Sequence, residues 1–248
     1  MADEPDIIGE VIEASTTEFA AESRQLHSPS PFGSFVKVLW HGEENLPQAP
    51  VIGSESAADE GDPFMDSFRQ KEGSFGPEYR SALDGESAEP VPDLSPAIYA
   101  VVHQATTTSV DTGRRLRAYW KDEEQLKQEQ PELSEWLLVT NFRAIIVGYS
   151  ANGLIRQFLP PQPPNLLTPV HPCTPDEIHL ITRRLDFLRT LTNFQNAPTE
   201  EVVAACIREA SNARGGNLEF LVAAGKELAN LLRDDYDRLQ AIMRRVAP

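Results

Sequence analysis

This sequence has few cysteines, no long apolar run and no basic stretch at its start. Only two cysteines occur, Cys173 and Cys206; they form no CxxC pair, and neither has a histidine at the spacing of a structural zinc site. We therefore expect two free, buried thiols. The longest apolar runs span about five residues, whereas a membrane span needs about 20. The first six residues are acidic and resemble neither a signal nor a transit peptide, so we expect a cytoplasmic protein without a membrane span.

Recognisable catalytic motifs are also lacking. The sequence has no G-x-x-x-x-G-K-[ST] run to cradle phosphates, no G-x-S-x-G elbow and no H-E-x-x-H pair. His171 and Cys173 are two residues apart with no third group to orient them, so they do not predict a nucleophile and base. We predict a protein that is not an enzyme, with no catalytic residue, cofactor or metal site. An enzyme with an unrecognised site is left open, and a large apolar pocket would favour it.

Negative charge is plentiful but unevenly placed. The formal net charge is −16; residues 1–95 carry 20 acidic and 5 basic side chains, whereas residues 96–248 carry 18 and 17. The acidic half could face a basic protein partner or could simply confer solubility. It opposes the phosphate contacts that dominate nucleic-acid binding, so we consider nucleic acid an unlikely partner.

The N-terminal part has the pattern of short β-strands. Residues 7–14, 16–20, 34–40 and 97–103 alternate or are rich in β-branched side chains, and turn residues separate them. Between them, residues 41–95 hold 13 acidic and 3 basic side chains with little periodicity, which predicts a disordered acidic insertion between two strands. Phe64, Met65 and Phe68 would share one face if this stretch formed a helical turn, which makes them a candidate docking motif.

A basic cluster and a hairpin follow. Arg114, Arg115, Arg117 and Trp120 could contact phosphates and a base, but Asp122 and the two following glutamates would neutralise them. One alternative is a loop in which the arginines pair with those acids and Trp120 packs on the barrel. Another is contact with the acidic insertion, as an internal or intersubunit clamp. Residues 121–130 predict a short polar helix. The strongest hairpin signal joins residues 137–149 to 154–159 through Asn152-Gly153.

The C-terminal part is predicted to be helical. A proline-rich connector at 160–173 separates a β-domain, residues 1–159, from a helical domain, residues 174–248. Thr174-Pro175-Asp176-Glu177 has the form of a capping box, and three amphipathic helices are expected after it, the last beginning at Asn217. The predicted fold class is α+β: a small antiparallel β-barrel with a long acidic insertion, followed by a helical region.

The strand residues carry a family resemblance. Residues 8–15 (IGEVIEAS), 31–38 (PFGSFVKV) and 98–102 (IYAVV) resemble the HAS barrel, a domain of HerA-type DNA translocases and rotary ATP synthases. The chain as a whole is similar to stand-alone HAS-barrel proteins of cyanobacteria. In the translocases the barrel precedes an ATPase core and helps to assemble the hexamer. Since this sequence lacks the phosphate-binding run of that core, the resemblance implies an assembly or interaction module.

Two functions of different classes are consistent with these features. The first is a non-catalytic scaffold or adaptor that acts through protein–protein contacts, with homo-oligomerisation possible. The alternative is an accessory factor in DNA processing, associated with a translocase or nuclease; it depends on the resemblance alone.

Overall fold

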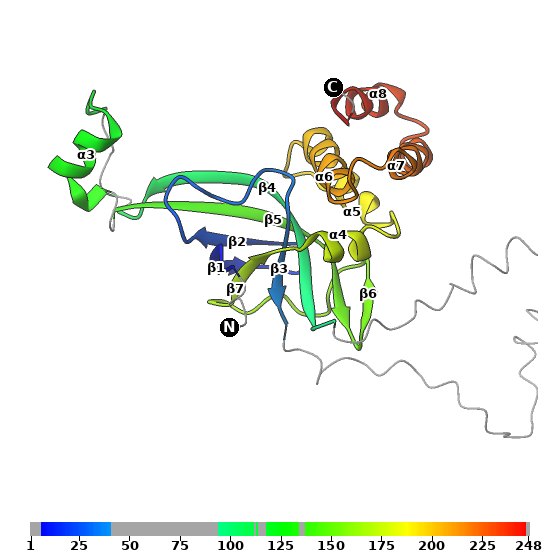
Figure 1. Cartoon of the computed structure of the whole chain (residues 1–248), viewed down its shortest axis with the longest axis horizontal. Coiled ribbons are helices and arrows are strands. Elements are labelled where there is room, and N and C mark those ends of the chain that lie inside the picture. The colour runs from blue at the N-terminus through cyan, green and yellow to red at the C-terminus, as the bar shows by residue number, and fades with distance from the viewer. Residues whose placement is uncertain (1–5, 41–93, 112, 114–117, 134–136, 247–248) are drawn as a thin grey trace, which may run out of the picture.

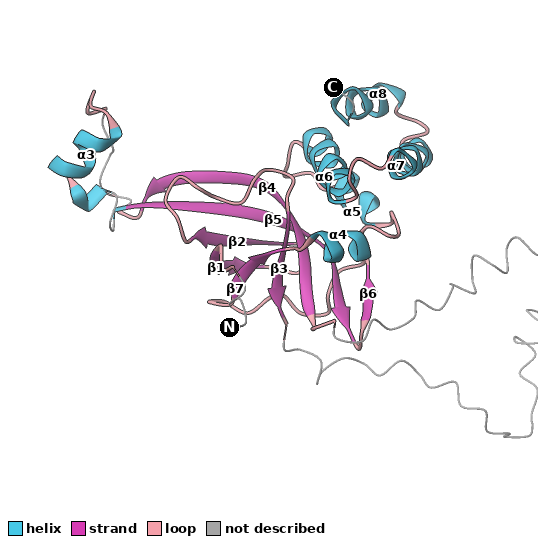
Figure 2. Ribbon diagram, in the orientation of Figure 1, coloured by secondary structure: helices cyan, strands magenta, loops and turns pink. Residues whose placement is uncertain are grey.

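A computed structural model describes residues 6–40, 94–111, 113, 118–133 and 137–246. The predicted acidic insertion, including Phe64 and Phe68, therefore lies almost entirely outside the described residues. Figures 1 and 2 show a β-barrel with helices on one side and a two-stranded ribbon that projects from it. The strands are β1 (Gly9–Ala14), β2 (Glu18–Ser23), β3 (Phe35–Leu39), β4 (Ala97–Ser109), β5 (Leu138–Ala151), β6 (Leu154–Arg156) and β7 (Pro169–Pro172).

Six of these strands close into an antiparallel ring. Around the ring the order is β1, β2, β5, β4, β3 and β7, and β7 returns to β1; β6 pairs antiparallel with the last residues of β5. This closed barrel with helices after it confirms the predicted α+β fold class.

The strand that closes the ring lies within the predicted connector. Residues 160–173 were expected to be a spacer, but Pro169–Pro172 form β7. Val170 pairs with both Gly9 and Val38, and its carbonyl accepts a hydrogen bond from the amide of Ile8 at 2.9 Å. Proline has no amide hydrogen and is tolerated at strand ends. Because a proline stands at each end of this four-residue strand, the sequence does not show the alternating pattern that predicts a strand.

Side chains fill the barrel interior. Each of the six ring strands contributes to one buried cluster of mainly apolar residues, which includes Phe19, Ile98 and Phe142. The interior is therefore a packed core, and any partner has to contact the outside of the barrel.

The helices cover the outer face of β3, β4 and β5. They are α4 (Pro175–Ile181), α5 (Phe187–Asn193), α6 (Thr199–Ala213), α7 (Leu218–Leu231) and α8 (Tyr236–Val246). Phe35, Tyr99 and Val147 point outward from the barrel into the same core as Leu188 and Val203. The predicted helical region thus shares a core with the barrel.

Two of the three expected helices are broken in the structure. The first divides into α4 and α5, and the third divides into α7 and α8. At the first break the side chain of Gln157 donates to the carbonyls of Ile181 and Arg184 and accepts from the amide of Phe187 at 3.0 Å. This partner comes from the end of the β6 hairpin, so the break depends on tertiary structure.

The local signals at turns and caps are confirmed. Thr174 and Glu177 form the predicted capping box, and Asn217 caps α7. Asn152 and Gly153 have φ angles of 53° and 73°, as a type I′ hairpin turn requires. The ribbon formed by β4 and β5 continues beyond this barrel wall and leads to the short helix α3 (Glu123–Glu129), at its far end in Figure 1.

Candidate functional site

Most of the sequence-predicted site residues lie outside the described part of the chain. This applies to Arg114, Arg115 and Arg117, and to both phenylalanines of the insertion. Trp120 is described: it is 94% exposed with a φ angle of 56°, so it does not pack on the barrel. Of the four residues predicted to form the basic cluster, the structure therefore describes only Trp120, whose side chain is exposed.

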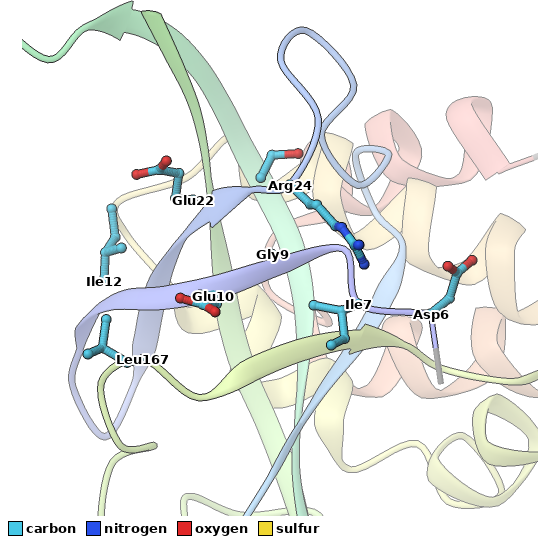
Figure 3. A pocket seen from close by; sticks show the side chains of 9 residues that line it. Asp6, Ile7, Gly9, Glu10, Ile12, Glu22, Arg24 and Leu167 are labelled. Atoms are coloured by element: carbon cyan, nitrogen blue, oxygen red, sulfur yellow. The ribbon is translucent and has the colours of Figure 1, made fainter. Parts of the chain in front are cut away.

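An open hollow lies on the outer face of β1 and β2 (Figure 3), with a volume of about 710 Å³. Gly9 is one of its lining residues, and an added Cβ there would lie 2.3 Å from the carbonyl oxygen of Glu22, so β1 and β2 approach closely at this point. The lining residues are Asp6, Ile7, Gly9, Glu10, Ile12, Glu22, Ser23, Arg24 and Leu167.

Like charges face each other across the hollow. Glu10 and Glu22 are direct cross-strand partners, and both side chains are exposed. Among the described residues neither carboxylate forms an ion pair, and the same holds for Asp6 and Arg24. Two carboxylates directly opposite on neighbouring strands repel by roughly 0.2–1 kcal/mol, an energy that a cation placed between them would reverse.

Apolar side chains border the same end of the hollow. A β-bulge makes Ile12 the extra residue of β1, and its side chain is 42% exposed beside Glu10. Leu167 is 72% exposed and has a φ angle of 62°, while its amide donates to the carbonyl of Val11 at 2.8 Å. Figure 3 places these two side chains with Glu10 and Glu22, and Asp6 and Arg24 toward the other end.

Strain at Leu167 adds to the case for this end of the hollow. A bulky residue at positive φ costs about 1–3 kcal/mol and persists where the surroundings impose it. The hydrogen bond to β1 imposes it here and leaves a leucine side chain in solvent. A surface that combines exposed apolar side chains with carboxylates that pair with no described cation is suited to binding a cationic, partly apolar partner.

A second cluster of ionisable groups joins β1, β2, β4 and β5. Arg143 contacts Glu13 at 2.6 Å and Glu18 at 3.5 Å, and the Nε2 atom of His103 lies 3.3 Å from Glu18. His103 is the extra residue of a β-bulge in β4, is 3% exposed, and packs edge-on against Phe194. Burial lowers the pKa of this imidazole, and its hydrogen bond to the Glu18 carboxylate opposes that shift.

This second cluster acts as a link between the barrel and the helices. The imidazole of His103 packs against Phe194, which follows α5, and Arg143 pairs with carboxylates from β1 and β2. We assign it a structural role.

The two thiols are also unsuited to nucleophilic chemistry. Burial raises the pKa of Cys206, and burial together with the charge of Glu177 raises that of Cys173. The imidazole of His171 faces the carbonyl of Asp6 at 3.3 Å. Both thiols therefore stay protonated near neutral pH; Cys206 is fully buried as predicted, whereas Cys173 is only partly buried.

Sequence reasoning missed the hollow because its parts come from distant segments. The alternation of residues 9–13 indicates that Glu10 points outward, but nothing in the sequence gives the register that places Glu22 opposite it. Leu167 reaches the site only because β7 pairs with β1.

Comparisons with known proteins do not assign this chain to a family. A scan against models of protein families gives no match, and a search of curated proteins gives no significant match. Within the described ranges, no group of three or more His, Cys, Asp or Glu side chains is arranged to hold a metal ion. None of the described helices has the length and apolar character to cross a membrane.

Proposed function

We propose that this chain is a non-catalytic scaffold or assembly module that binds protein through the hollow on β1 and β2. The observation that carries the proposal is that Glu10 and Glu22 face each other without an ion pair to any described residue, beside the exposed side chains of Ile12 and Leu167. A lysine or arginine from a partner would neutralise both carboxylates, and apolar side chains next to it would cover the rim.

Charge favours protein over nucleic acid at this surface. Three carboxylates and one guanidinium line the hollow, so phosphate groups would be repelled. The closed six-stranded barrel is compatible with the resemblance to the HAS barrel, and we include that relationship in the proposal. The assembly role of the barrel in the translocases supports the same function.

Paired affinity purification from cells of the native host tests the proposal. Tagged wild type is compared with Glu10→Lys/Glu22→Lys, and partners are quantified by mass spectrometry. The matched control is Glu219→Lys/Asp234→Lys, which makes the same change of charge on exposed residues of the helical side. We expect a stoichiometric partner with wild type and control that falls about tenfold or more with the hollow variant.

A second variant separates loss of binding from loss of fold. Leu167→Asn removes the apolar side chain but keeps a residue that tolerates positive φ, so the fold is retained. Circular dichroism checks each variant. The proposal is wrong if all four proteins recover the same partners in the same amounts.

A further inference from the structure

Two bulky, solvent-exposed residues have strained backbones. Among the described residues that are not glycine, four have positive φ angles: His27, Trp120, Asn152 and Leu167. Asn152 belongs to the hairpin turn, and the amide of His27 bonds to Thr140 at 2.9 Å. Trp120 and Leu167 remain, each with a large apolar side chain in solvent. Exposed tryptophan is typical of interface centres, and strain is typical of functional surfaces.

These two residues lie at different parts of the molecule. Leu167 borders the hollow, whereas Trp120 is in the segment between β4 and β5. The pairing of β2 with β5 ends at Asn141, and from Thr140 to Leu138 β5 pairs only with Thr107–Ser109 of β4. The two strands thus lead away from the barrel in Figure 1. We call the stretch of chain from Thr107 to Thr140 the arm; the structure describes 107–111, 113, 118–133 and 137–140 of it.

The sequence of the arm is complementary to the hollow. Residues 114–117 read Arg-Arg-Leu-Arg and connect Gly113 to Ala118, so they lie in sequence just before Trp120. Three arginines and a leucine match the three carboxylates and the apolar rim of the hollow, which includes Ile12 and Leu167. One chain therefore carries both halves of a complementary contact.

We propose that the arm of one copy of this chain docks in the hollow of a second copy, and that the contact is reciprocal. Trp120 covers Leu167 and Ile12, and the arginines of residues 114–117 neutralise Glu10 and Glu22. The same patch pair is then used twice across a two-fold axis, as in most homodimers. This inference rests on the binding role proposed for the hollow and names its partner.

Sedimentation velocity on the purified full chain tests the dimer. Wild type is expected to dimerise with rising concentration, and added salt is expected to weaken the dimer because charge pairs contribute to it. Trp120→Ala is expected to raise the dimer dissociation constant about tenfold or more, whereas Leu218→Ala, which truncates another exposed apolar residue, leaves it unchanged.

Charge reversal gives the sharpest test. One variant reverses the hollow, Glu10→Lys/Glu22→Lys, and the other reverses the arm, Arg114→Glu/Arg115→Glu/Arg117→Glu. Each alone brings like charges together at both contacts and is expected to be monomeric. When they are mixed, the basic arm meets an acidic hollow and the acidic arm meets a basic one, so a heterodimer is expected.

The outcomes separate this inference from the proposed function. A monomeric wild type, a dimer that survives both reversals, or a mixture that stays monomeric overturns the arm-in-hollow dimer. If any of these occurs while the hollow variant still loses a different partner in the affinity purification, the proposed function stands. In that case only the identification of the partner as a second copy of this chain is wrong. If the hollow variant also loses no partner, both are wrong.

Discussion

Lys37 of β3 and Glu177 of α4 form an ion pair, with 2.5 Å between Nζ and Oε1, where the helical region meets the barrel. Both side chains are more than four-fifths buried. The other carboxylate oxygen of Glu177 accepts a hydrogen bond from the amide of Thr174 at 2.9 Å. One carboxylate therefore both caps the helix and holds it against the barrel.

Replacing Lys37 with methionine tests this dual role. The change leaves Glu177 largely buried without its cation, so we expect a loss of roughly 1–3 kcal/mol in the free energy of unfolding, measured in urea by circular dichroism. Lys121→Met is the matched control, because it removes an exposed pair with Glu129 and should cost less than about 0.5 kcal/mol. Equal losses in the two variants would contradict the role assigned to Glu177.

Gly33 gives a second test of the contact between barrel and helices. It has a φ angle of 83°, and an added Cβ would lie 2.3 Å from the Cβ of Ala205 in α6. Gly216 has a similar φ angle of 80° but nothing within 4 Å of such a Cβ. We expect Gly216→Ala to cost about 1–2 kcal/mol from backbone strain alone. Gly33→Ala should cost about 1–3 kcal/mol more in the same urea experiment, because the loop and α6 must move apart.

The pair of glycine variants isolates the packing contribution. Both substitutions impose the same left-handed backbone, so the difference between them reports the overlap with Ala205. If both proteins unfold at the same urea concentration, the loop does not pack against α6 as closely as the structure shows.

Local signals in the sequence predicted the parts of the fold that depend on neighbouring residues. The Asn152-Gly153 turn and the Thr174 capping box each form from adjacent side chains and backbone, so both are readable without the fold. The alternation of the strands indicated the barrel class for the same reason.

The parts that depend on long-range contacts could not be read in this way. The break between α4 and α5 is made by Gln157, about 30 residues before Phe187, to which it bonds. The strand at Val170 forms by pairing with β1 on one side and β3 on the other, and both partners are far away in the sequence. The hollow depends on the same strand, since its rim includes Leu167, which precedes β7 and bonds to Val11 of β1.

The thiols provide a chemical test of burial. Since burial raises the pKa of both Cys173 and Cys206, neither forms a thiolate at about pH 8, where an exposed cysteine reacts readily. We expect a colorimetric disulfide reagent to modify neither thiol quickly in the folded protein and both in urea. Fast modification of either one before unfolding would mean that the helical region opens locally, and Cys173→Ser or Cys206→Ser would show which thiol reacts.

His103 is expected to make stability depend on pH. Burial lowers the pKa of its imidazole below the ordinary value of about 6.5, the hydrogen bond and charge of Glu18 oppose this shift, and Arg143 adds to it. The unfolded chain therefore binds a proton more readily than the folded one. Stability from this residue is complete above about pH 6.5 and declines as the pH falls from there toward the lower pKa of the folded state.

The variant His103→Gln isolates this effect from the other ionisable groups. Both proteins retain Glu13, Glu18 and Arg143, so the free energy of unfolding of wild type minus that of the variant should fall as the pH is lowered from about 7.5 to about 5.5. Urea unfolding at several pH values measures it. A difference that grows toward acid pH would mean that the attraction of Glu18 outweighs burial, because the folded state would then hold the proton more tightly than the unfolded chain.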